Sequence, residues 1–179
     1  MICNNLKKCI DKQLSKDTLR ECDNRKDDCI DSTDTRSSVK CEERGKKYIY
    51  ENIKKKHVIL YKMDGGVVVE DKFVPKNTNK CDYLYVINDT ELTAVLTELK
   101  GVNVPKSLEQ IKGTLLLYKN VFKDFGHVYA RIIVTSSTPN LKASPTYINL
   151  QKTLRQTYNG NIKISERQLF EKDSDLDKM

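Results

Sequence analysis

Two apolar runs joined by a polar turn, KCDYLYVINDTELTAVLTELKG (residues 80–101), decide how this chain folds. Residues 82–87 and 92–99 are rich in β-branched and aromatic side chains, which favour strands. Between them, NDTE (88–91) supplies the residue types of a turn between antiparallel strands. The stretch therefore predicts a β-hairpin that turns near residue 90.

Three ionisable side chains gather at the open end of this hairpin. When a hairpin turns near residue 90, paired residues have numbers that sum to about 180, so Asp82 stands opposite Glu98. Facing residues on one side of a sheet have Cβ atoms about 5 Å apart. Lys100 is two residues beyond Glu98 and therefore projects from the same face. The register predicts one patch that holds two carboxylates and an amine.

Such a patch has the chemistry of metal-assisted phosphodiester hydrolysis. Two neighbouring carboxylates repel, and a divalent cation relieves the repulsion. Mg²⁺ binds one or two protein carboxylates together with waters and phosphate oxygens, and a nearby lysine can stabilise charge that develops on a phosphate. The alternative is that Asp82 and Glu98 are solvated strand ends with Lys100 as a salt-bridge partner. All three residues at this register favour the catalytic interpretation.

Downstream of the hairpin, predicted helices alternate with predicted strands. A single apolar stripe predicts a helix over 108–125, with Ser107 as its N-cap and Gly126 just after its end. The remaining predicted elements are a strand over 129–137, a helix over 146–158, a strand over 161–170 and a disordered acidic tail over 171–179.

Upstream, residues 1–38 are polar and thin in large apolar groups, so they are expected to form an N-terminal extension that is helical or partly flexible. The elements predicted next are a helix over 38–54, a strand over 57–63, a DGG turn at 64–66, a short strand over 67–74 and a loop over 75–80. This order predicts that residues 39–170 form an α/β domain, with a central mixed β-sheet flanked by helices and an α-β-β-β-α-β core.

Composition narrows the class of protein. The 179 residues carry a formal net charge of +7, and residues 41–164 alone hold 20 basic and 12 acidic side chains, which suits a domain that attracts phosphates. The sequence has neither a membrane-spanning apolar stretch nor a signal peptide at its start, so a cytoplasmic protein without membrane contact is expected. Six cysteines without a C-x-x-C pair favour reduced thiols over disulfides or a zinc site.

The CDYLYV run, its spacer and TELKG resemble the PD-(D/E)XK, or restriction-endonuclease-like, nuclease superfamily. Its signature is an acid at the start of one strand and E-x-K on the next, and Asp82, Glu98 and Lys100 match it one for one. Cys81 replaces the proline of the family name. DGG, CDYL, ELKG and the following EQIKGT are also similar to small stand-alone prokaryotic members. The resemblance covers roughly residues 40–165, and the family's usual element order agrees with the order predicted above.

The resemblance implies a role for each matched residue. Asp82 and Glu98 would bind Mg²⁺ or Mn²⁺ together with the backbone carbonyl of Leu99. Lys100 would orient the attacking water and stabilise the pentavalent phosphate. Gln110 would help to position substrate or water.

Further residues are candidates for supporting roles. Many members of the superfamily add an acid from the first helix, for which Glu42 and Glu43 are the candidates. The candidates for contacts with backbone phosphates are Lys54, Lys55, Lys56, Lys106 and Lys112.

The predicted function is a Mg²⁺-dependent nuclease that hydrolyses DNA, in defence against foreign DNA or in DNA processing, with RNA left open as a substrate. A homodimer would suit double-strand cleavage, and a regulatory partner protein is a further open possibility. The alternative is a catalytically silent nucleic-acid-binding or protein-interaction module on the same fold. The sequence has no P-loop and no nucleophile elbow, and His57 and His127 belong to no recognisable motif.

Overall fold

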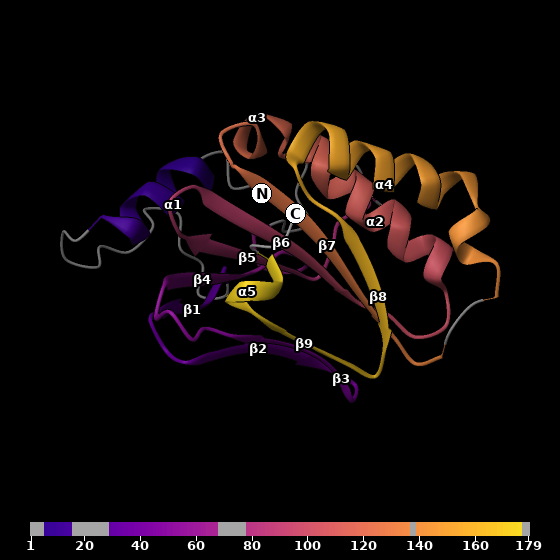
Figure 1. Ribbon diagram of the computed structural model, residues 1–179, viewed down its shortest axis with the longest axis horizontal. Coiled ribbons are helices and arrows are strands. Elements are labelled where there is room, and N and C mark those ends of the chain that lie inside the picture. Colours follow the sequence, from indigo (N-terminus) through magenta and orange to yellow (C-terminus); the bar gives the residue numbers. More distant parts are fainter. Residues whose placement is uncertain (1–5, 16–28, 68–77, 137–138, 177–179) are drawn as a thin grey trace.

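A six-stranded mixed sheet is the centre of the molecule (Figure 1). The computed structural model describes residues 6–15, 29–67, 78–136 and 139–176. In spatial order the strands of this sheet are β1 (Ile30–Asp34), β4 (His57–Lys62), β5 (Tyr83–Asn88), β6 (Leu92–Leu99), β7 (His127–Val134) and β8 (Ile162–Glu166). The pairs from β1 to β6 are antiparallel, and β6, β7 and β8 are parallel.

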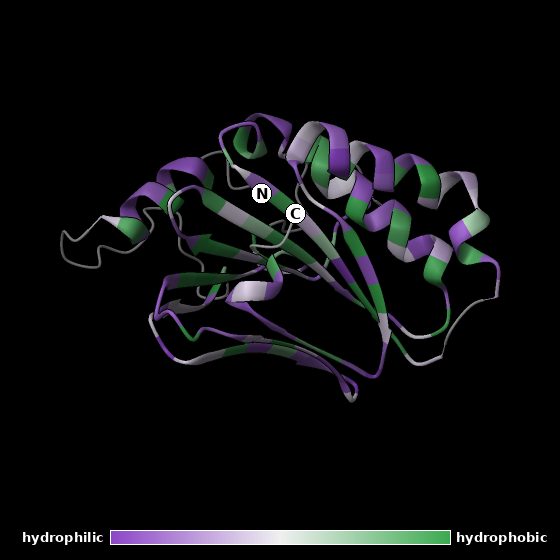
Figure 2. Ribbon diagram, viewed as in Figure 1, coloured by the Kyte–Doolittle hydropathy of each residue, from purple (hydrophilic) through white to green (hydrophobic). Residues whose placement is uncertain are grey.

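The register of the β5–β6 hairpin agrees with the prediction from sequence. Tyr83 pairs with Thr97 and Leu84 pairs with Leu96, so the residue numbers of each pair sum to 180. Both faces of the central strands are covered, which explains their almost continuous apolar runs. Figure 2 shows this apolar character in the green stretches along the central strands.

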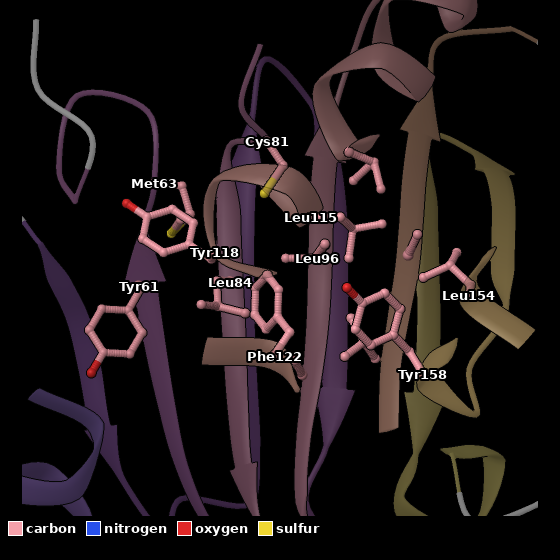
Figure 3. Packing of buried hydrophobic residues seen from close by; sticks show 14 of the residues in the cluster. Tyr61, Met63, Cys81, Leu84, Leu96, Leu115, Tyr118, Phe122, Leu154 and Tyr158 are labelled. Atoms are coloured by element: carbon pink, nitrogen blue, oxygen red, sulfur yellow. The ribbon is translucent and has the colours of Figure 1, made fainter. Parts of the chain in front are cut away.

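Helices cover one face of the six-stranded sheet (Figure 1). They are α1 (Leu6–Leu14), α2 (Val104–Leu117), α3 (Lys119–Phe122) and α4 (Pro145–Tyr158), with a short 3₁₀ turn, η1 (Leu141–Ala143), before α4. Their apolar side chains pack on those of the strands, as Figure 3 shows for Phe122 and Tyr158 beside Leu84 and Leu96. This packing buries one of the two apolar cores of the protein.

A three-stranded sheet covers the opposite face (Figure 1). It consists of β2 (Ser38–Glu43), β3 (Lys46–Glu51) and β9 (Gln168–Lys172), in the order β2-β3-β9, and the short helix α5 (Asp173–Leu176) follows it. Tyr48 and Tyr50 of β3 are completely buried between the sheets, where Tyr48 meets Tyr85 edge to face at 5.1 Å between ring centroids. The protein is therefore an α/β protein with two sheets and helices packed against them.

Residues 38–54 do not form the predicted helix. They form β2 and β3, joined by a tight turn in which Arg44 and Gly45 have φ angles of 47° and 76°. Two positive φ angles in succession are typical of the two-residue turns that join twisted antiparallel strands. Burial alternates along β2, with Val39 and Cys41 turned inward, so the segment has the period of a strand.

The predicted helix over 108–125 also differs from the structure. Helix α2 begins earlier, and Asn103 rather than Ser107 is its N-cap, because Asn103 Oδ1 accepts a 3.1 Å hydrogen bond from the Lys106 amide. The helix ends at Leu117, and α3 is a separate short helix. The predicted helix over 146–158 and the predicted strand over 57–63 are confirmed within one residue at each end.

The C-terminal segment is more ordered than predicted. The single strand expected over 161–170 is two strands in different sheets, because the chain turns at Arg167, whose φ angle is 61°. Glu171 and Asp173 are buried, so residues 171–176 are not a disordered tail. Residues 177–179 lie outside the described residues.

Of residues 1–38, the described segments 6–15 and 29–38 pack against the rest of the domain. Leu6 and Ile10 of α1 are buried in the helix-side core, and β1 pairs with β4. The predicted strand over 67–74 lies outside the described residues beyond Val67. None of the described helices has both the length and the apolar character needed to cross a membrane.

Candidate active site

Asp82, Glu98 and Lys100 meet at one end of the central strands of the six-stranded sheet, where β5 begins and β6 ends. Leu84 and Leu96 face the helix-side core, and Asp82 and Glu98 are each two residues further along their strands, so they lie on the same face. The Leu99 amide donates a 2.7 Å hydrogen bond to Asp82 Oδ2. Lys100 Nζ is 3.5 Å from Glu98 Oε1. The structure therefore brings together the three residues that the sequence placed in one patch.

Glu98 is the most unusual group in the site. Its side chain is fully buried, and neither of its carboxylate oxygens accepts a well-formed hydrogen bond from a described residue. The pKa of Glu98 is raised to about 9, first by burial and then by the negative charge of Asp82, while the Lys100 ammonium opposes both effects. An ionised carboxylate in such a position is costly unless a cation compensates it.

Asp82 is also poorly suited to carry a charge alone. Burial raises its pKa to about 6, against the opposing effect of the hydrogen bond from the Leu99 amide. The negative charges of Glu43 and Asp64 also raise this pKa, and Lys100 lowers it. The two carboxyls thus form a pair whose charged state needs an additional positive group.

Of the two candidate third acids, the structure places Glu43 beside the site. Tyr83, the first residue of β5, donates a 3.1 Å hydrogen bond from its hydroxyl to Glu43 Oε1. Glu42 instead lies on the outer face of the three-stranded sheet, 3.3 Å from Lys47 Nζ. Glu43 comes from a strand and not from the first helix, so the helical location implied by the resemblance is wrong. The hydrogen bond from Tyr83 to Glu43 was not predicted, because it joins strands of two different sheets.

Helix α2 supports the segment that precedes Asp82. Gln110 Nε2 donates a 3.0 Å hydrogen bond to the Lys80 carbonyl, and the Cys81 amide donates a 2.8 Å bond to Thr114 Oγ1. Gly113 lies so close to this segment that an added Cβ would be 2.1 Å from the Asn79 carbonyl oxygen. Gln110 therefore positions the backbone beside Asp82. Thr114 was missed because only the packing of the helix brings it there.

The donor set for a cation is small. Within the described part of the chain, no three His, Cys, Asp or Glu side chains form a group that could hold a metal ion. Asp82 and Glu98 are the candidate carboxylate ligands, and the Leu99 carbonyl is the candidate backbone ligand. Mg²⁺ commonly takes only one or two protein carboxylates and fills its other positions with water and phosphate oxygens. The residues present fit a Mg²⁺ or Mn²⁺ ion of this kind.

No family model, curated protein or solved structure matches this chain. Its function is therefore inferred from the chemistry and the geometry of the site itself. The buried carboxylate of Glu98, its neighbour Asp82 and the half-buried amine of Lys100 are the features on which that inference rests.

The predicted phosphate-contacting lysines are divided between two ends of the molecule. Lys54 and Lys55 precede β4, at the end of the strands opposite to Asp82. The six residues of β4 separate these two ends by about 17 Å. Lys56 is nearly buried there, ion-paired with Asp89. These three lysines do not share the site.

The two lysines of α2 are closer to the site. Lys106 is exposed in the first turn of α2, which begins at the same end of the strands as the three site residues. Lys112 lies further along the helix, 3.9 Å from Glu109 on the exposed surface. Of the five predicted lysines, Lys106 is therefore the one best placed to contact a substrate at the site.

Proposed function

We propose that this protein is a metal-dependent nuclease that hydrolyses phosphodiester bonds of DNA by attack of water on phosphorus. The observation that carries the proposal is the buried carboxylate of Glu98, which accepts no well-formed hydrogen bond from the described residues and lies beside a second carboxylate and an amine. The resemblance of the motif to PD-(D/E)XK nucleases and the order β4-β5-β6-α2-β7 also support it.

Each group has a chemical role in this reaction. Asp82, Glu98 and the Leu99 carbonyl would hold Mg²⁺ or Mn²⁺, which supplies positive charge to a bound phosphate and lowers the pKa of a bound water. Lys100 Nζ is half-buried beside Glu98, where it could hold the attacking water and stabilise charge on the phosphate in the transition state. Gln110 and Thr114 keep the backbone before Asp82 in place.

The experiment is cleavage of linear, end-labelled oligonucleotides by the purified full-length chain. Duplex DNA, single-stranded DNA and RNA of one sequence are incubated with Mg²⁺, with Mn²⁺ and with EDTA. We expect cleavage of DNA with either metal and none with EDTA. The variant Lys100→Ala should lose the activity, whereas Lys112→Ala, which removes the same charge elsewhere on the surface, should keep it.

Two results would contradict the proposal. One is equal cleavage by the wild-type protein and Lys100→Ala, which would indicate a contaminating nuclease. The other is the absence of cleavage of every substrate with both metals. Binding of DNA without cleavage would then favour a catalytically silent nucleic-acid-binding module on this fold.

A further inference from the structure

Two turns that are distant in the sequence meet at the edge of the molecule that holds the site. The β2–β3 turn contains Arg44, and the β8–β9 turn contains Arg167. The Lys47 amide donates a 2.9 Å hydrogen bond to the Arg167 carbonyl, which joins the start of β3 to the second turn. Figure 1 shows both turns at the lower right, beside the loop that leads into α2.

Backbone hydrogen bonds connect the β8–β9 turn to the end of β7, and the end of β7 to Lys100, which follows β6. The Arg167 amide donates a 2.8 Å bond to the Val134 carbonyl at the end of β7, and the Lys100 amide donates a 2.9 Å bond to the Ile133 carbonyl next to it. The ends of β6, β7 and β8 are therefore adjacent. With neighbouring strands about 5 Å apart, the backbone of Arg167 lies about 10 Å from that of Lys100.

The two turns carry cations that the fold itself does not use. Arg44 and Arg167 are exposed, and neither forms an ion pair with any described residue. Both have positive φ angles, 47° and 61°, at turn positions where glycine or asparagine would be less strained. A long cationic side chain at each of these positions is thus unexplained by folding alone.

A further cation lies on the other side of the site. Lys106, in the first turn of α2, is exposed and also lacks an ion pair with the described residues. The helix layer and the three-stranded sheet each lie about 10 Å from the central sheet, so Lys106 and Arg44 are separated by about 20 Å. Arg167 lies between them, where the chain passes from β8 of the central sheet to β9. Over that length one strand of a B-form duplex carries about six phosphates.

We infer that Arg44 and Arg167 form a phosphate-binding rim on the three-stranded-sheet side of the site, opposite Lys106, and that a DNA strand crosses the site between them. This inference rests on the proposed function, because it assigns the rim to the substrate of that site. Neither arginine was among the phosphate-contacting residues predicted from the sequence, which were all lysines. It contacts phosphates away from the reacting one, so it contributes to binding of polymeric DNA and not to the chemical step.

The first test measures binding without cleavage. Fluorescence anisotropy of a labelled duplex is recorded in EDTA at several salt concentrations for the wild type and for Arg44→Asn/Arg167→Asn. Asparagine is chosen because it tolerates positive φ. The control is Lys54→Asn/Lys55→Asn, which removes two charges at the opposite end of the strands. Like the arginine variant, it replaces a residue with positive φ, since the φ angle of Lys55 is 54°.

We expect the arginine variant to bind at least about tenfold more weakly and its log–log salt slope to fall by about 2, since each phosphate contact contributes about 0.9. The lysine control should bind as the wild type does. Equal binding by the wild type and the arginine variant, or an equal loss in the control, would overturn the inference. Thermal unfolding of both variants shows whether a loss reflects misfolding.

The second test separates the rim from the catalytic site. Hydrolysis of a small chromogenic phosphodiester in Mn²⁺ is compared with cleavage of DNA. We expect Arg44→Asn/Arg167→Asn to raise KM for DNA while hydrolysis of the small ester is unchanged. A loss of small-ester hydrolysis in this variant would overturn the inference. Absence of hydrolysis of both substrates by the wild type, with rim-dependent DNA binding retained, would instead overturn the proposed nuclease and leave the rim.

Discussion

The backbone amide of Leu99 donates a 2.7 Å hydrogen bond to the carboxylate of Asp82. Leu99 lies between Glu98 and Lys100 in the sequence. This bond therefore ties Asp82 to the backbone that carries the second carboxylate and the amine. It also keeps one oxygen of Asp82 engaged, which leaves the other oxygen for a cation.

Replacement of Asp82 by asparagine should abolish metal binding and preserve the fold. The amide oxygen of asparagine can still accept the hydrogen bond from Leu99, but it carries no negative charge to hold the cation. Calorimetric titration with Mn²⁺ should detect one site in the wild type and none in Asp82→Asn. Asp64→Asn, an exposed acid nearby, is the control and should bind Mn²⁺. Equal affinity in Asp82→Asn and the wild type would exclude Asp82 as a ligand.

Replacement of Lys100 by alanine should reduce cleavage by at least about 100-fold, the usual effect of removing one group that stabilises the transition state. Mn²⁺ binding should be retained, because the two carboxylates remain. Lys100→Arg should restore little activity, since a planar guanidinium does not take the place of a compact ammonium beside Glu98. Single-turnover cleavage at saturating protein measures the effect, and full activity in Lys100→Arg would argue against a specific role for the amine.

The metal-free protein should lose stability as the pH rises from 6 to 9. The pKa of Glu98 is raised to about 9, chiefly by burial, whereas the pKa of the same group in the unfolded chain is about 4. In this window the unfolded state therefore binds fewer protons, and unfolding becomes easier by up to about 1.4 kcal/mol per pH unit. The contribution of Asp82 ends near its own raised pKa, about 6.

Thermal unfolding in EDTA across this range tests the pH dependence. We expect Tm to fall between pH 6 and pH 9 in the wild type and to stay nearly constant in Glu98→Gln, which has no charge to ionise. A parallel fall in both proteins would show that another group is responsible. Mn²⁺ should restore Tm of the wild type at high pH and leave that of Glu98→Gln unchanged.

Substitution of Gly113 by alanine should lower both stability and activity. The added Cβ would lie 2.1 Å from the Asn79 carbonyl oxygen, so α2 or the segment before Asp82 must move. Overpacking of this kind costs about 1–3 kcal/mol. Denaturant unfolding of Gly113→Ala is compared with that of Gly101→Ala, where an added Cβ meets nothing within 4 Å. Equal stability of the two variants would show that α2 is not held tightly against this segment.

A buried ionic cluster joins the two sheets, and its central acid should be important for stability. Glu171 of β9 accepts hydrogen bonds from Arg131 Nε at 2.5 Å, Lys163 Nζ at 2.6 Å and the Tyr48 hydroxyl at 3.0 Å. Because Arg131 is completely buried, Glu171→Gln leaves a buried charge without its partner and should cost about 3 kcal/mol.

Denaturant unfolding measures this cost. The matched control is Glu109→Gln, which removes an exposed acid from α2 and should change the free energy of unfolding by less than about 0.5 kcal/mol. A similar small change in Glu171→Gln would mean that the cluster contributes little to holding the sheets together.

The site could be predicted because it depends on a local structure. A two-strand hairpin has a register determined by its own turn and by its apolar alternation, so Asp82, Glu98 and Lys100 followed from residues 80–101 alone. The segment over 38–54 could not be predicted in the same way. Its lysines and glutamates are compatible with a helix, and the strand conformation became favourable only because Tyr48 and Tyr50 pack against the central sheet.

The sequence by itself therefore determined the hairpin, the α/β class and the three charged residues at the hairpin's open end. Only the tertiary structure decided that Glu43 rather than Glu42 approaches Asp82. It also decided that Lys54 and Lys55 lie at the opposite end of the strands and that Arg167 lies near the site. The physical reason is the range of the interactions. Hairpin pairing is specified by neighbouring residues, whereas the positions of β2, β3 and β9 depend on burial against strands that are distant in the chain.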